Sequence, residues 1–176
     1  MGYSWARYVR RYITYVRKYN KLTRNLLTEL SHILTSSLLI SFNIRRDTTL
    51  SIVLSRSMEE SLTLIIRGSI IKQLRADEES AMGFIKAALQ ERIPHIMVLN
   101  GIRPKVHKPI YCLNFTGPTL EDVVKCTPKS TLIIGDIELI KTITSECKWV
   151  SLYPGIYRLE DAVVIYHYVL DRCSAT

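Results

Sequence analysis

Short apolar runs and longer amphipathic stretches alternate along this chain, and the two patterns predict different elements. Short runs of aliphatic, β-branched or aromatic residues between turn residues are typical of buried strands. A polar turn over Ser55–Ser61 joins two such runs, so we expect a hairpin there. The predicted strands are Leu38–Phe42, Thr49–Leu54, Leu62–Ile66, His95–Leu99, Ile110–Phe115, Thr131–Ile134 and Trp149–Leu152.

Apolar residues at helical spacing predict the helices that separate these strands. Thr23, Asp77 and Thr119 each precede an amphipathic stretch and are suited to cap its first turn. Further helices are predicted over Glu138–Glu146 and over a final stretch with an apolar stripe from Leu159 to Leu170. Strands that alternate with helices indicate a mostly parallel sheet covered on both faces. The sequence therefore predicts an α/β fold.

Residues 1–21 are basic and aromatic, and their pattern does not decide between helix and strand. Tyrosines recur at helical spacing, yet Tyr12–Val16 has the composition of a strand, so both structures stay open for residues 3–19. We expect a basic N-terminal arm over 1–21, followed by a single domain over 22–176. The arm is a candidate for nucleic-acid contact, and the alternative is a solvated basic face whose tyrosines pack on the core.

The formal net charge of +8 favours a polyanionic partner, with nucleic acid ahead of membrane. A second basic segment, Ile102–Pro109, contains two prolines and is predicted to be an exposed loop. No apolar stretch fits a signal peptide or a membrane span, so we expect a cytoplasmic protein. The residues expected to contact RNA are Arg10, Arg11, Arg17, Lys18, Arg103 and Lys105.

The four cysteines are widely spaced and form no Cys-x-x-Cys or His/Cys cluster, which argues against a metal site. Buried thiols are the favoured interpretation, while disulfides stay open.

The last three predicted strands all end in loops of small or conformationally permissive residues. These loops are Asn114–Pro118, Gly135–Asp136 and Tyr153–Gly155. In a parallel sheet they would gather at one edge and form one ligand pocket, where a glycine lets backbone and ligand approach. No G-x-G-x-x-G, Walker or nucleophile-elbow motif is present, which removes the main support for dinucleotide, nucleotide-triphosphate and hydrolase functions.

Several of these segments, in this order, are similar to those of one family over about Leu22 to Asp171. They are Asn43–Asp47, Asp77-Glu78 with Phe84–Leu89, Ile110–Leu113, Leu132–Asp136, Val150–Pro154 and Ile165–Asp171. The chain resembles the archaeal tRNA pseudouridine N1-methyltransferase family (TrmY), which belongs to the SPOUT superfamily of knotted methyltransferases. It departs from the family's Gly-Asp-His-x-Gly, because Ile137 and Leu139 stand at the third and fifth positions. Tyr153 and Ala162 also replace the family's usual serine and cysteine.

The resemblance implies a deep C-terminal trefoil knot, a homodimer, and S-adenosylmethionine as methyl donor without a metal. It implies tRNA as the partner, with methylation of N1 of pseudouridine at position 54 in the T-loop. Asp47 is the hypothetical proton acceptor, and Arg45 or Arg46 would hold phosphate or the negative charge that develops on the base. An ordinary charged turn is the alternative for these three residues. The implied cofactor-binding residues are Leu113, Asn114, Gly135, Asp136, Leu152, Tyr153, Ile156 and Ala162.

Two alternatives to this function remain at the level of sequence. One is methylation of another RNA, such as ribosomal RNA. The other is a catalytically silent RNA-binding protein that keeps the fold, which a pocket blocked by Leu139 or Tyr153 would favour. A purely structural dimerisation protein is disfavoured, because such a role does not need the excess of basic residues.

Overall fold

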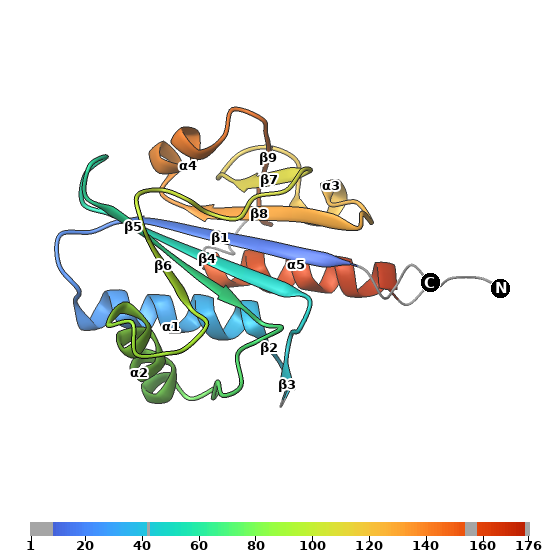
Figure 1. Cartoon of the computed structure of the whole chain (residues 1–176). Coiled ribbons are helices and arrows are strands. Elements are labelled where there is room, and N and C mark those ends of the chain that lie inside the picture. The colour runs from blue at the N-terminus through green and yellow to red at the C-terminus, as the bar shows by residue number, and fades with distance from the viewer. Residues whose placement is uncertain (1–8, 42, 154–157, 175–176) are drawn as a thin grey trace.

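A seven-stranded sheet forms the centre of the computed structural model, which describes residues 9–41, 43–153 and 158–174 (Figure 1). Every neighbouring pair is parallel except the two that involve β5, which runs against β4 and β6. The predicted mostly parallel α/β fold is therefore confirmed. The strands in spatial order are β6 (Met97–Asn100), β5 (Ser61–Arg67), β4 (Thr48–Ser55), β1 (Arg10–Lys18), β8 (Lys129–Gly135), β7 (Ile110–Leu113) and β9 (Cys147–Val150).

Strand β1 corrects the expectation of a basic arm over 1–21. It lies in the middle of the sheet, and Arg11 pairs with Thr48 of β4 on one side and with Ser130 of β8 on the other. Six consecutive residues from Arg11 to Val16 are buried, because the two faces of a central strand are both covered. Residues 10–18 are thus a strand of the core, while residues 1–8 lie outside the described residues.

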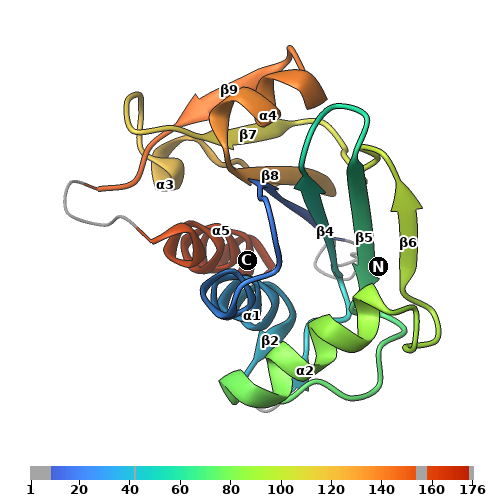
Figure 2. The ribbon, with the colours of Figure 1, turned by 90° about the vertical axis from the view of Figure 1, so that its left-hand side faces the viewer.

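The helices cover the two faces unequally (Figure 2). The large face packs against α1 (Arg24–Leu38), α2 (Glu78–Leu89) and α5 (Leu159–Ser174), with the short α3 (Leu120–Val123) beside α5. The smaller face packs against α4 (Ile137–Ile143). Two of the predicted caps form, because Thr23 Oγ1 accepts from Leu26 N at 3.2 Å and Asp77 Oδ1 accepts from Ser80 N at 2.9 Å.

The predicted strand Leu38–Phe42 is confirmed only for Leu39–Ile40, because Leu38 belongs to helix α1, Ser41 lies in a turn, and Phe42 lies outside the described residues. Helix α1 continues to Leu38, whose buried side chain belongs to the same apolar stripe as Leu34. Only β2 (Leu39–Ile40) is extended, and it pairs with β3 (Asn43–Ile44) in a separate two-stranded sheet. A short apolar run at a helix end does not separate helix from strand, because both periodicities bury it.

The segment 101–109 crosses the smaller face diagonally, and we call it the strap. Hydroxyl groups on β5, β4 and β8 hold its backbone. Its basic side chains Arg103 and Lys105 are exposed, as predicted. The bonds join Thr63 Oγ1 to Gly101 O (2.7 Å) and to Arg103 N (2.9 Å), Ser51 Oγ to Lys105 N (3.0 Å), and Thr131 Oγ1 to His107 N (2.7 Å) and His107 O (2.8 Å).

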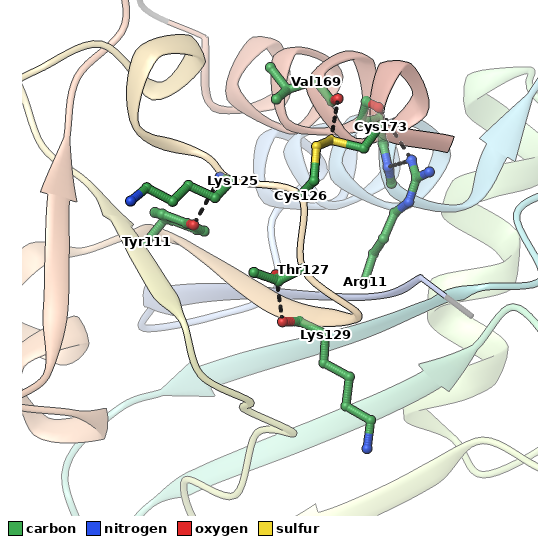
Figure 3. Close-up of a disulfide and its surroundings, with 9 residues drawn as sticks. Arg11, Tyr111, Lys125, Cys126, Thr127, Lys129, Val169 and Cys173 are labelled. Carbon is green, nitrogen blue, oxygen red and sulfur yellow. Dashed lines mark hydrogen bonds between the residues drawn. A yellow bond between two sulfur atoms is a disulfide. The ribbon is translucent and has the colours of Figure 1, made fainter. Parts of the chain in front are cut away.

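All four cysteines form disulfides, Cys112–Cys147 and Cys126–Cys173, so the favoured interpretation as buried thiols is wrong. The first joins neighbouring strands β7 and β9. The second ties the segment before β8 to the last turn of α5, close to Arg11 (Figure 3). Each pair lies far apart in sequence, and spacing alone could not reveal it.

Two negative findings apply to the described part of the chain. No helix there is long and apolar enough to cross a membrane, and no group of three or more His, Cys, Asp or Glu side chains could hold a metal ion. The segment 154–157 between β9 and α5 lies outside the described residues, so the trefoil knot stays a prediction.

Candidate functional site

A cavity of about 750 Å³ lies at the carboxyl ends of β7, β8 and β9. This is the edge at which ligands bind in open α/β sheets, and the volume is within the usual range for small-molecule sites. We call it the strand-end cavity. It is lined by Leu113, Asn114, Phe115, Thr116, Gly117, Thr119, Gly135, Ile137, Ser151, Leu152, Tyr153, Arg158 and Leu159.

The floor of the strand-end cavity depends on Gly135 at the end of β8. Its φ of +120° is unfavourable for residues with a side chain, and a Cβ there would collide with the carbonyl oxygen of Val16. Directly after it, Asp136 N donates to that same oxygen at 3.0 Å. Its contact with β1 therefore requires the glycine, whereas the sequence pattern alone indicated the approach of a ligand.

Reciprocal hydrogen bonds fix the wall formed by the β7 loop and the end of β9. Ser151 N donates to Pro118 O at 2.9 Å, Leu120 N donates to Ser151 O at 2.8 Å, and Ser151 Oγ donates to Gly117 O at 2.8 Å. On the other side of the loop, Asn114 N donates to Val150 O at 2.8 Å. The wall thus combines a fixed backbone with apolar side chains, which suits a flat, partly apolar ligand such as a nucleoside.

Five of the eight implied cofactor-binding residues line the strand-end cavity: Leu113, Asn114, Gly135, Leu152 and Tyr153.

Two of the other three implied residues are not part of the cavity lining, and the third lies outside the described residues. Asp136 lies next to it, and its carboxylate accepts from Lys18 N at 2.5 Å and faces Arg17 at 3.6 Å. Ala162 is fully buried in the core, and Ile156 lies outside the described residues.

The two residues suspected of blocking the pocket do not close it. Leu139 is 3% exposed and packs into the core of the smaller face, away from the cavity lining. The Tyr153 side chain is half-exposed at the rim, and its hydroxyl lies 3.4 Å from Glu121 Oε2. Ile137 does line the cavity. The sequence pattern predicts the loop Asn114–Pro118 only as a group, and no pattern in the sequence indicates Arg158.

The predicted catalytic residues lie at the opposite edge of the sheet, where each has partners. Arg45 makes two hydrogen bonds to Asp171, at 3.1 and 3.0 Å. Arg46 donates to the carbonyl oxygens of Gly68 and Ile71 at 2.9 and 2.7 Å. Asp47 Oδ2 lies 3.0 Å from Arg11 Nε.

Strand register separates Asp47 from the strand-end cavity within one chain. Asp47 directly precedes Thr48, which pairs with Arg11, whereas Gly135 pairs with Val16. The two rows are five residues apart along β1, which is about 17 Å at roughly 3.3 Å per residue. Within one chain, Asp47 is therefore not at the strand-end cavity, and its role as proton acceptor stays a prediction.

Arg11 is the centre of a buried polar cluster at this amino edge, so its expected RNA contact is also wrong. It is 3% exposed and donates to His167 Nδ1 at 3.0 Å and to Asp171 Oδ1 at 2.6 Å. His167 Nε2 lies 3.0 Å from Ser37 O, which accepts its proton, so the imidazole is the neutral Nε2–H tautomer. Burial, followed by the charges of Arg45 and Arg11, lowers the pKa of His167 to about 3.

Asp171 completes this cluster as a carboxylate. Burial alone would raise its pKa, but hydrogen bonds from Arg45 and Arg11 outweigh burial and hold the pKa below its usual value. Two arginines thus share the carboxylates of Asp171 and Asp47, and the cluster joins β1, the start of β4 and α5.

The remaining predicted RNA contacts divide between the two edges of the sheet. Arg17 and Lys18 lie at the carboxyl end of β1, where they line a hollow of about 330 Å³. Arg10 and Lys105 lie near the amino edge, and Arg103 is exposed on the strap.

Comparisons with known proteins give a match to a family model and a similar solved structure. Residues 26–102 match a family model described as "Putative SAM-dependent RNA methyltransferase". A search of curated proteins found no match. The fold is similar to that of Archaeoglobus fulgidus Nep1 bound to S-adenosylhomocysteine, with a TM-score of 0.57 and 15% sequence identity over 87% of this chain and 72% of that one. At this identity the likeness shows a shared fold, and the family model covers the segment from α1 to the end of β6.

Proposed function

We propose that the chain is an S-adenosylmethionine-dependent RNA methyltransferase whose donor binds in the strand-end cavity. The observation that carries the proposal is this open cavity at the ends of three parallel strands, which Leu139 and Tyr153 leave accessible. The family match over residues 26–102 and the S-adenosylhomocysteine bound to Nep1 support the same donor.

The lining of the cavity fits such a donor. Backbone groups of Leu113, Asn114, Gly135 and Leu152 would hold the adenine and ribose, and the side chains of Leu152 and Leu159 would provide an apolar wall. Backbone contacts tolerate the departures from the family's side chains, because an amide or carbonyl does not depend on residue type. S-adenosylmethionine supplies an electrophilic methyl group when it is bound.

The substrate that the family resemblance favours is N1 of pseudouridine in the tRNA T-loop. Its ring nitrogen must lose a proton as it attacks the methyl group, so a proton acceptor is needed near the cavity. In the same chain, the row next to Asp47 lies about 17 Å along the sheet from Gly135, which is too far for that role. In the predicted homodimer, a second copy would have to bring its own amino edge to the cavity for Asp47 to act.

Calorimetric titration with S-adenosylhomocysteine tests the donor site directly. We expect saturable binding of one ligand per chain, and strongly weakened binding in Thr116→Trp, which fills the cavity from an exposed loop position. Ser145→Trp places the same bulk at an exposed site outside the cavity lining and should bind as the parent does. Absence of binding in the parent protein would favour the silent RNA-binding alternative.

Transfer of a labelled methyl group to tRNA transcripts tests the substrate. Transcripts with pseudouridine or uridine at the T-loop position, otherwise identical, should differ, with transfer only to pseudouridine. Equal transfer to both would contradict N1 of pseudouridine as the acceptor, and transfer only to ribosomal RNA would favour the other RNA substrate.

A further inference from the structure

A second hollow, of about 420 Å³, lies at the amino edge on the strap side of the sheet. It is separate from the strand-end cavity, because Tyr12 in its lining pairs with Thr131, four residues before Gly135 and thus roughly 13 Å along the strand. We call it the basic hollow. It is lined by Arg10, Tyr12, Arg46, Asp47, Thr49, Arg67, Ser69, Lys105 and His107.

The positive charge of the basic hollow is not neutralised by the protein. Arg10, Arg67 and Lys105 are exposed, and none of the three makes an ion pair with a described residue. The one carboxylate in the lining, Asp47, faces the buried guanidinium of Arg11. Arginines and lysines that converge on a hollow without carboxylate partners form a binding surface for an anion.

The pKa of His107 reflects this excess of positive charge. Its ring lies 4.1 Å from the ring of Tyr12, and the strap backbone holds it through Thr131. Burial lowers the pKa of His107, and the positive charges of Lys129, Lys105 and Arg10 lower it further. Lys105 and Arg10 line the basic hollow, from the strap and β1, and Lys129 on β8 adds positive charge from outside the lining.

The positive surface is larger than the area that a single phosphate group would cover. Arg46 also lines a neighbouring hollow of about 340 Å³ together with Lys72 and Arg75. Because Arg46 is shared by both hollows, the cations follow one another along the amino edge. Such an arrangement fits a polymer with repeated negative charges better than it fits a single small anion.

We propose that the basic hollow binds the phosphate backbone of the RNA substrate, at a site distinct from the strand-end cavity. This inference rests on the proposed function for the identity of the polyanion. It assigns RNA contact to Arg67 beside Arg10 and Lys105, and it places that contact at the edge of the sheet opposite the donor.

The salt dependence of RNA binding tests the proposal. The probe is a short fluorescein-labelled single-stranded RNA, and the variant is the double substitution R67Q/K105Q. Each lost phosphate contact lowers the slope of log K against log salt by about 0.7 for single strands, so we expect a decrease of about 1.4 and about 25-fold weaker binding at about 0.1 M salt. The control K86Q/R92Q removes the same charge from exposed positions in and just after α2 and should leave the slope unchanged.

Conservative exchange separates charge from structure. R67K/K105R keeps both charges and should keep most of the affinity. An unchanged slope in R67Q/K105Q, or an equal decrease in the control, would overturn the proposal. Titration with S-adenosylhomocysteine distinguishes this outcome from failure of the proposed function: donor binding with an unchanged slope refutes only the RNA site, whereas a decreased slope without donor binding refutes only the methyltransferase.

The titration of His107 by NMR provides a readout inside the basic hollow. Bound phosphates oppose the cations that lower the pKa of His107, so we expect the RNA probe to raise that pKa in the parent protein. An increase with inorganic phosphate but none with RNA would overturn the proposal in favour of a small-anion site. No change with either probe would overturn it as well.

Discussion

The two ends of the central strands in this sheet are built on different physical principles. At the carboxyl edge, β7, β8 and β9 end in loops that backbone hydrogen bonds hold in place, and an apolar cavity stays open. At the amino edge, Arg11, Arg45, Asp47, His167 and Asp171 close the structure through ion pairs and hydrogen bonds. At the carboxyl edge the backbone holds the loops, so side chains are free to contact a ligand. At the amino edge the side chains hold the fold together, and the exposed cations are the groups that can contact a partner.

The largest expected effect is at the carboxyl edge, in Gly135→Ala. The added Cβ meets the Val16 carbonyl oxygen at a positive φ, so we expect a loss of roughly 4–6 kcal/mol in the free energy of unfolding, from backbone strain and steric overlap together. Chemical denaturation measures it. Gly83→Ala is the matched control, because a Cβ there meets no atom within 4 Å and should stabilise α2 by about 0.5–1 kcal/mol. Equal stability of the two variants would contradict the role assigned to Gly135.

The amino edge should be the acid-sensitive one. The pKa of His167 is about 3 when folded and near 6.5 when unfolded, so the unfolded chain binds more protons between these values. The part of the free energy of unfolding that depends on neutral His167 is therefore fully present above about pH 6.5. It is lost as the pH decreases toward 3, and the loss is on the order of 3–5 kcal/mol. Asp171 adds a loss in the same direction as the pH falls through its lowered folded pKa.

The measurement is the free energy of unfolding against pH. His167→Gln should be less stable near neutral pH but should show a flatter profile between pH 6.5 and 3. His32→Gln, at a partly exposed histidine of α1 that lies outside the amino-edge cluster, should keep a profile as steep as that of the parent. A His167→Gln profile as steep as that of the parent would show that other groups cause the acid sensitivity.

Removal of the Cys126–Cys173 disulfide should loosen the amino edge alone. Its 47-residue separation predicts a loss of about 2–4 kcal/mol in the double serine variant, because the unfolded chain regains conformational freedom. Neither cysteine lines the strand-end cavity, so the affinity for S-adenosylhomocysteine should not change. A parallel loss of affinity would show that the two edges are coupled through α5.

The smallest expected effect is that of Tyr153→Ala at the cavity rim. The ring is half-exposed and the contact of its hydroxyl to Glu121 is long, so the change in the free energy of unfolding should stay within about 0.5 kcal/mol. Binding of S-adenosylhomocysteine, measured by calorimetry, should weaken by less than about tenfold, because the backbone wall is retained. A complete loss of binding would mean that the side chain of Tyr153 holds the ligand.

Local pattern predicted the carboxyl edge better than the amino edge. The apolar runs and the loops after Leu113, Ile134 and Leu152 are contiguous in sequence, so three strand ends and their shared pocket could be predicted from them. For Arg11 the sequence indicated an RNA contact instead of a buried ion pair. Its partners Asp47 and Asp171 are distant in the chain, and only the fold brings them together. The place of β1 between β4 and β8, and both disulfides, are likewise products of long-range pairing.

The attachment of the strap through its backbone affects which of its residues can be substituted during evolution. Thr63, Ser51 and Thr131 hold the strap by its main-chain atoms, so the identity of its own side chains is not fixed by these attachments. Substitutions at Lys105 can therefore alter the electrostatic potential of the amino edge while the sheet is preserved. Related chains could diverge in the nucleic acids they prefer through this one segment, with the donor cavity left as it is.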